Sequence, residues 1–302
     1  MLFPHDFHIH THCSCDSASA SVSHIVEACR KMGYKHYGIS DHLHTHFNYP
    51  DIEIARKEFL ELEARPANFH FGLELSCATK WECEKIAARD YTSCFTYILK
   101  GKPFRTITPI DGIMYGGPPN GPLYLDITKK EMEKLGIEYI IGGVHKPNYT
   151  EQEPLPMIED YFNQMRFMLE DDRIDILAHP WWALSFWSSY AILTGDPKDR
   201  NYDSFYMIPR EYWDELAKMF VENGKLAELN TFIMSEKIPE KLLHFYLEEM
   251  TKWKEKGVRF TFGSDLHAKE YEFDLVFRFG EQLKSYGFTE NDFALPPRLK
   301  NV

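Results

Sequence analysis

The chain has 302 residues, of which 34 are basic, 46 are acidic and 44% are apolar, so its net charge is -12. This length and apolar content allow one substantial core, whereas the acidic balance argues against a nucleic-acid surface, which needs clustered Lys and Arg. The sequence contains no leader-like amino terminus and no apolar run of about 18 residues. We therefore expect a cytoplasmic protein that does not bind membranes. The six cysteines, all in the first third, do not resemble a disulfide framework.

Apolar runs of strand length alternate with helical segments along the chain. The predicted strands are residues 7–9, 37–39, 69–75, 138–144, 174–178, 226–230 and 259–263. The predicted helices are residues 23–32, 158–170, 210–222 and 241–256, together with a short helix that Thr128 caps and Gly136 ends. This alternation favours parallel βα units, and seven of them predict an α/β fold with a closed or nearly closed barrel.

Six short motifs that end apolar runs carry most of the acid and imidazole groups. They are Asp-Phe-His-Ile-His-Thr (6–11), Ser-Asp-His (40–42), Gly-Leu-Glu (72–74), Gly-Val-His (143–145), Ala-His-Pro (178–180) and Gly-Ser-Asp-Leu-His (263–267). A barrel assembles its active site at the carboxyl ends of its strands, whereas an open doubly wound sheet would bring so many strand ends together less readily. Imidazole and carboxylate groups bind divalent metals, so the motifs predict a multinuclear metal site that activates water.

Spacing supports this interpretation. His8 and His10 lie two residues apart, and so do Asp265 and His267, so each pair shares one face of an extended segment. A carboxylate such as Glu74 after an apolar strand is costly inside a barrel mouth unless it is paired or binds a metal. Any one of these residues could be an ordinary core or loop residue, but their occurrence at so many strand ends favours a shared metal cluster.

Two connections are much longer than usual for a barrel. The first spans residues 76–137, and the second, residues 181–208, is rich in aromatic side chains. Both begin just beyond a predicted ligand, so we expect them to flank the active site as a specificity wall or lid. The alternative is that the aromatic side chains only cover the barrel rim.

The order and local sequence of the motifs, from Asp6 to His267, resemble the polymerase and histidinol phosphatase (PHP) superfamily. The resemblance implies one distorted (βα)7 TIM-like barrel domain over residues 1–302, which hydrolyses phosphate esters with two or three metal ions. The implied ligands of the more buried metal pair are His8, His10, Glu74, His145 and Asp265. Asp16, His42, His179 and His267 would complete a trinuclear site. The passage from Glu74 to His145 is longer than is usual in the family, which leaves the substrate open.

The expected mechanism is attack on phosphorus by a hydroxide that bridges two metals. Asp6 and Asp41 are expected to orient neighbouring histidines through the second ring nitrogen, or else to cap turns. Lys146 is favoured over Lys80 and Arg105 as the cation that binds the phosphate. The remaining histidines, including His44 and His46, receive no ligand role, and those two are expected to be solvated loop residues.

Several functions are compatible with these residues. We favour hydrolysis of a small phosphomonoester, either histidinol-phosphate-like or a nucleotide. A phosphodiesterase and a metal-dependent hydrolase of C–N or C–O bonds are the alternatives, and the open site disfavours a metal-storage or sensing module. Imidazole-rich ligation suits zinc, iron or manganese. The sequence leaves the oligomeric state open.

Overall fold

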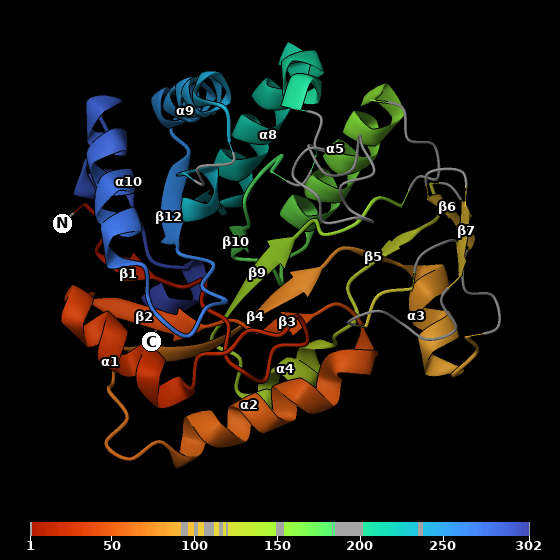
Figure 1. Cartoon of the computed structure of the whole chain (residues 1–302), viewed down its shortest axis with the longest axis horizontal. Coiled ribbons are helices and arrows are strands. Elements are labelled where there is room, and N and C mark those ends of the chain that lie inside the picture. The colour runs from red at the N-terminus through yellow and green to blue at the C-terminus, as the bar shows by residue number, and fades with distance from the viewer. Residues whose placement is uncertain are drawn as a thin grey trace.

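The computed structural model describes residues 2–91, 96–99, 102–105, 112–114, 117–118, 120–148, 154–182, 184, 202–234 and 238–301. The central feature of this part is a parallel sheet that curls into a nearly closed barrel (Figure 1). Within the described residues, no helix is both long enough and apolar enough to span a membrane.

Seven parallel strands follow one another around the barrel. In spatial order they are β1 (His5–Asp6), β2 (His36–Ile39), β4 (Phe69–Ser76), β9 (Tyr139–Gly143), β10 (Ile176–Leu177), β11 (Leu226–Asn230) and β12 (Arg259–Gly263). The short β3 (His42–Leu43) pairs with the end of β4 and sets His42 opposite Glu74. Two backbone hydrogen bonds close the ring beyond β1 and β12, from Asp265 N to His8 O (2.8 Å) and from His10 N to Leu266 O (3.0 Å). The expected α/β barrel is confirmed.

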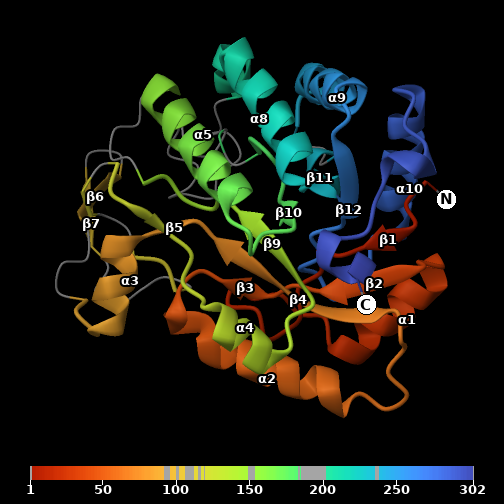
Figure 2. The ribbon, with the colours of Figure 1, turned by 180° about the vertical axis from the view of Figure 1, so that it is seen from behind.

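Helices cover the outside of the barrel in two groups (Figures 1 and 2). The helices on one side are α1 (Val22–Met32), α2 (Tyr49–Glu61) and α4 (Lys129–Leu135). Those on the other side are α5 (Pro154–Glu170), α8 (Arg210–Asn223), α9 (Glu240–Glu255) and α10 (Phe273–Ser285). The described residues also form short 3-10 helices: η1 (His46–Asn48), η3 (Tyr202–Met207), η4 (Thr231–Met234), η5 (Glu290–Asp292) and η6 (Pro297–Asn301).

Capping residues fix several helix ends, and Thr128 and Gly136 begin and end α4 as predicted. Ser21 accepts a hydrogen bond from His24 N at the start of α1, and Gly33 ends that helix with a left-handed φ of 74°. Thr128 forms a capping box with Glu131 at the start of α4. The helices α2, α3 and α10 are not among those that the sequence signals predict. The first strand was also misplaced, because the Asp6 carboxylate accepts the His8 N–H (3.2 Å), and the ladder with β2 stops at Asp6.

Alternate strand residues face two separate cores. The larger core, here called the outer core, lies between the sheet and the helices and contains Ile140, Leu177 and Ala227. The smaller core, here called the inner core, lies inside the barrel, and its members are Phe7, Tyr139, Ile141, Ile176, Ala178, Leu226 and Leu299. Along the chain these apolar residues come before the polar ones at the strand ends: Tyr139 and Ile141 precede His145, and Ile176 precedes His179.

The first insertion forms small elements at one edge of the barrel (Figure 1). They are β5 (Ala78–Thr79), α3 (Lys80–Ala87), β6 (Thr96–Leu99), β7 (Lys102–Arg105) and β8 (Leu123–Tyr124). Most of the second insertion lies outside the described residues, but Trp181 and Phe205 at its two ends are buried in the outer core. The expectation of a single domain over residues 1–302, with insertions at 76–137 and 181–208 that flank the active site, remains a prediction.

Tyr139 ties three strands together inside the barrel. Its hydroxyl donates toward Phe7 O (2.7 Å) and Ile39 O (2.9 Å). Its ring fills space that only glycine leaves open, because a Cβ on Gly72 would lie 2.4 Å from the ring. We predict that Tyr139→Phe lowers the free energy of unfolding by about 1–3 kcal/mol, since buried carbonyls lose their donor.

Chemical denaturation of the metal-free protein measures this loss. Tyr124→Phe is the matched control, because Tyr124 is exposed, and its replacement should change stability little. Equal stabilities of the two variants would show that the Tyr139 hydroxyl does not hold the strands.

Candidate metal centre

Glu74, at the end of β4, lies at the middle of a cluster of imidazoles and carboxylates. Its side chain is fully buried. One oxygen, Oε1, faces His145 Nε2 (2.9 Å) and His179 Nε2 (3.3 Å). The other, Oε2, faces His8 Nε2 (3.0 Å) and His42 Nδ1 (3.0 Å). The carboxylate therefore has the position of a bridge between two sets of metal-ligand atoms.

Asp265 completes the group around His8 and His10. Its Oδ1 lies 3.3 Å from His8 Nε2 and 3.2 Å from His10 Nε2. The two imidazole nitrogens are 3.0 Å apart. His8 and His10 point to the same side, as their spacing predicts, and Ile9 between them belongs to the outer core.

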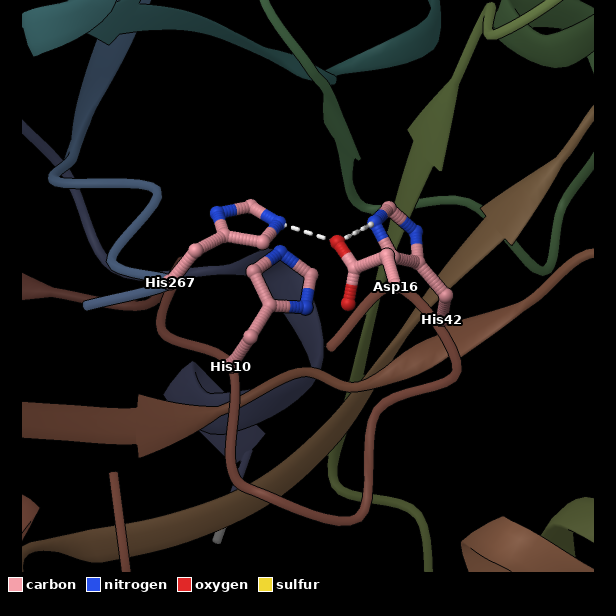
Figure 3. A group of neighbouring side chains, drawn as sticks. All are labelled: His10, Asp16, His42 and His267. Atoms are coloured by element: carbon pink, nitrogen blue, oxygen red, sulfur yellow. Dashed lines mark ion pairs between the residues drawn. The ribbon is translucent and has the colours of Figure 1, made fainter. Parts of the chain in front are cut away.

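Asp16 joins the cluster from the loop after His10. Its Oδ2 lies 3.2 Å from His42 Nε2 and also pairs with His267 Nε2. Figure 3 shows this carboxylate between the rings of His42 and His267, with His10 beside them. All nine predicted ligands are thus brought together at the carboxyl ends of the strands.

The donor set fits divalent metal ions. Within the described part of the chain, three groups made up only of predicted ligands have ligand atoms within 4.8 Å of one another: His8, His10 and Asp265; Glu74, His145 and His179; and His10, Asp16, His42 and His267. His44 forms a further such group with His42 and His145. Among the described residues, His179 Nδ1 and Asp16 Oδ1 are buried without a hydrogen-bond partner. Buried polar atoms seldom lack a partner. Six imidazoles with three carboxylates match the ligand preference of zinc, iron and manganese.

The charges of the metal-free cluster shift several pKa values strongly. Burial opposes ionisation of Glu74, but His8, His145 and His42 outweigh it and hold the pKa of Glu74 well below its usual range. Burial also opposes the charge on His42, yet Glu74 and Asp16 raise the pKa of His42 to about 10. The cluster thus stores protons at positions where a metal cation would bind.

Two predicted ligands have a left-handed backbone. His179 has a φ of 27° and Asp265 a φ of 53°. Such a conformation costs a non-glycine residue about 1–2 kcal/mol, and strain of this kind concentrates at functional sites. The backbone strain is therefore consistent with a functional demand on both side chains.

Glu228, in the middle of β11, is a buried carboxylate that was not among the predicted site residues. Its Oε1 lies 2.6 Å from His8 Nδ1, and its Oε2 accepts the backbone N–H of His179 (2.8 Å). Asn230 donates to both Glu228 and Asp265 (3.1 Å each). Gly263 leaves room for Glu228, because a Cβ there would lie 1.8 Å from its Oε1. Like Glu74, Glu228 is a carboxylate within an apolar strand and needs a partner, and this is the signal in the sequence that marks it.

We expected Asp6 and Asp41 to orient histidine rings. In the structure both carboxylates instead accept hydrogen bonds from backbone N–H groups and hydroxyls. Asp6 accepts the N–H groups of His8 and Ser264 (3.2 Å each) and the Tyr271 hydroxyl (2.7 Å). Asp41 accepts both the N–H and the hydroxyl of Thr11 (2.6 Å each). Only the contact of Asp6 with the His8 N–H is a local turn; the other contacts join segments that are far apart in the sequence. The carboxylate that contacts the second ring nitrogen of a predicted ligand is Glu228.

His44 is a buried histidine rather than a solvated loop residue. Its Nδ1 lies 2.5 Å from Ser76 Oγ, which in turn lies 2.6 Å from His145 Nδ1. Burial, together with the charges of His42 and His145, keeps the pKa of His44 well below its usual value. His46 is exposed and pairs with Glu131 (2.9 Å).

Lys146, the predicted phosphate-binding cation, pairs with a carboxylate of the protein. Its ammonium group is buried, pairs with Glu82 and donates to Met114 O (3.2 Å). The side chain therefore links the end of β9 to the first insertion. Of the alternatives, Lys80 is exposed and lies 3.8 Å from Glu84, whereas the side chain of Arg105 lies outside the described part.

A cavity of about 590 Å³ opens beside Asp265 and His267. It lies between η4 and α10, with apolar walls from Phe232, Met234 and Leu275 and charged groups from Glu272 and Arg278. This volume falls within the range of small-molecule sites. Because Asp265 and His267 line the cavity, it borders the cluster.

Comparisons with known proteins agree with this geometry. The sequence profile of the PHP domain matches residues 6–232. The histidinol phosphate phosphatase of Lactococcus lactis subsp. lactis Il1403, solved with zinc, L-histidinol and phosphate, has a TM-score of 0.54 and 14% identity, over 95% of each chain. A Listeria monocytogenes protein assigned as a histidinol phosphatase has a TM-score of 0.50 and 12% identity, over 88% of this chain and 96% of that one. These likenesses show the fold alone. No curated protein sequence matches the chain.

We predict that Glu228→Gln weakens metal binding by about 10–100-fold, because His8 loses the carboxylate that fixes its ring. Metal titration of the purified variant measures this change. Glu222→Gln, near the exposed end of α8, is the control and should bind metal as the wild type does. Unchanged metal affinity of Glu228→Gln would remove Glu228 from the support of the site.

A second prediction concerns pH. The pKa of His42 is raised from 6.5 to about 10 in the metal-free fold. The associated stabilisation of that fold is complete below pH 6.5 and is lost as the pH rises through about 10. A metal must displace this proton, so metal affinity should keep rising by about tenfold per unit above pH 7.5.

Competition against a chelator, corrected for chelator protonation, measures this dependence between pH 6.5 and 9. Histidines of ordinary pKa would be deprotonated by about pH 7.5. A plateau in affinity above that pH would therefore contradict the raised pKa of His42.

Proposed function

Because the chain belongs to the PHP domain family, we propose that it is a metal-dependent phosphatase that acts on a small phosphorylated substrate. The central position of Glu74 carries this proposal. Its two oxygens face separate sets of imidazoles, which suits two ions held side by side by one carboxylate. Two-metal sites of this kind are common in phosphatases and nucleases.

We propose that the nine predicted side chains are the metal ligands: His8, His10, Asp16, His42, Glu74, His145, His179, Asp265 and His267. Bound divalent ions would polarise the phosphoryl group and lower the pKa of a water molecule. Glu228 would hold the ring of His8, and Ser76 would hold that of His145. Asp6 and Asp41 would keep the ligand-bearing segments in place through backbone N–H groups.

The cavity beside His267 supports a small substrate. Its charged groups, Glu272 and Arg278, are of opposite sign, and its walls are partly apolar. A phosphomonoester whose leaving group carries a cation or a ring would match these features. The Lactococcus protein, solved with L-histidinol and phosphate, makes histidinol phosphate the first substrate to test, with nucleotides next.

The metal and the cellular setting are also proposals. Zinc is the first candidate, because it is present in the Lactococcus structure, and manganese and iron suit the same ligands. We propose two or three ions per chain and a cytoplasmic location. Nucleic acid is not expected as a partner, because the net charge of -12 repels phosphate backbones.

Phosphate release by the zinc-, manganese- and iron-reconstituted protein tests this function. The panel contains histidinol phosphate, nucleoside monophosphates and a diester. We predict that at least one monoester is hydrolysed. Turnover should fall by about 100-fold or more in His145→Ala, because the set of ligands that faces Glu74 Oε1 loses an imidazole. His244→Ala is the matched control, because His244 lies on the exposed face of α9.

Three results would change the proposal. Full turnover by His145→Ala would mean that the measured activity does not come from this site. Release from the diester alone would indicate a phosphodiesterase. No release from any substrate, with metals bound, would shift the interpretation to hydrolysis of C–N or C–O bonds.

A further inference from the structure

A second group of metal-ligand atoms lies outside the cluster around Glu74. It consists of His12 and Cys13, in the loop between His10 and Asp16, and Glu58 on α2. None of the three belongs to the nine ligands of the barrel site. We propose that they form a separate site for one zinc-like divalent ion.

The distances between the ligand atoms suit tetrahedral coordination. His12 Nε2 lies 3.2 Å from Glu58 Oε1 and 3.9 Å from Cys13 Sγ. Bond lengths to zinc of about 2.0–2.1 Å for nitrogen and oxygen and about 2.3 Å for sulfur, at tetrahedral angles, require separations of about 3.3 Å and about 3.6 Å. All three ligand atoms lie within 4.8 Å of one another. Small side-chain movements would complete the site.

The chemistry of the group selects the ion. A thiolate favours zinc or cobalt over magnesium, calcium or manganese, which prefer oxygen ligands. Three protein ligands leave a fourth position for water. His12 and Glu58 are partly exposed, with 44% and 34% of their side-chain surfaces accessible, so an ion can enter from solvent.

The local backbone already presents Cys13 toward this position. The Cys13 N–H donates to Thr11 Oγ1 (3.0 Å), and Thr11 is itself held by Asp41. An exposed His12–Glu58 ion pair by itself would contribute little stability. A bound metal ion would also engage the Cys13 thiol, so that three side chains instead of two would join the loop to α2.

This loop connects the two sites. It contains Ser14, whose hydroxyl lies 3.4 Å from His10 Nδ1 and accepts the His42 N–H (3.4 Å), and it ends at Asp16. An ion at His12, Cys13 and Glu58 would therefore fix the segment that brings Asp16 to the barrel site. The proposal concerns a structural ion and does not depend on the reaction performed there.

Cobalt substitution separates the two sites, because the nine barrel ligands contain no sulfur. The metal-free full chain is titrated with cobalt(II) and followed by absorption and by bound cobalt per chain. We expect a thiolate-to-cobalt charge-transfer band. Cys13→Ser should lose the band and bind one cobalt fewer, whereas Cys15→Ser, two residues further along the loop, should keep both.

Three outcomes would overturn the proposal: no such band in the wild type, a band that persists in Cys13→Ser, or a band lost only in Cys15→Ser. The last result would show that Cys15, and not Cys13, supplies the sulfur ligand.

A measurement on the wild-type protein does not depend on the folding of a variant. Alkylation of Cys13 is followed by mass spectrometry with and without zinc, after the barrel site has been saturated with manganese. Zinc should slow the alkylation of Cys13 by about tenfold or more, since a metal-bound thiolate is protected. An equal rate with and without zinc would exclude a metal-thiolate bond at Cys13.

Discussion

The fully buried carboxylate of Glu74 imposes the main physical constraint on this protein. An ionised carboxylate inside a barrel is costly unless cations or hydrogen bonds compensate for it. The chain supplies this compensation from four directions, through His8, His42, His145 and His179. In the metal-free protein, imidazoles with a raised pKa, such as His42, supply positive charge beside the carboxylate, and in the loaded protein metal ions would take over this role.

This constraint explains how the inside of the barrel is divided. Apolar side chains such as Tyr139 and Ile176 fill the lower part of the barrel, whereas charged groups occupy the carboxyl ends of the same strands. Glycines at the boundary make room for both layers, as Gly72 does for the Tyr139 ring and Gly263 for Glu228. Packing and polar chemistry thus occupy successive layers, and the apolar layer shields the cluster from solvent on one side.

Closure of the barrel and assembly of the site are linked. The hydrogen bonds that close the ring run between the segments that carry His8, His10 and Asp265. Asp6 strengthens the same junction, because it accepts N–H groups from both segments. A distortion of the junction would therefore displace ligands, and loss of the cluster would weaken the closure. This linkage gives a reason for the strained backbone of Asp265.

Local signals in the sequence are enough to predict most of the strands, the helix that Thr128 caps, and polar motifs at the strand ends. The full set of nine ligands, Asp16 included, came from the resemblance to the PHP superfamily. The partners of the charged groups, in contrast, follow from the folded chain. Glu228 reaches His8 across 220 residues, and Lys146 pairs with Glu82 across 64. Local spacing does not encode such contacts, because they depend on which strands become neighbours when the barrel closes.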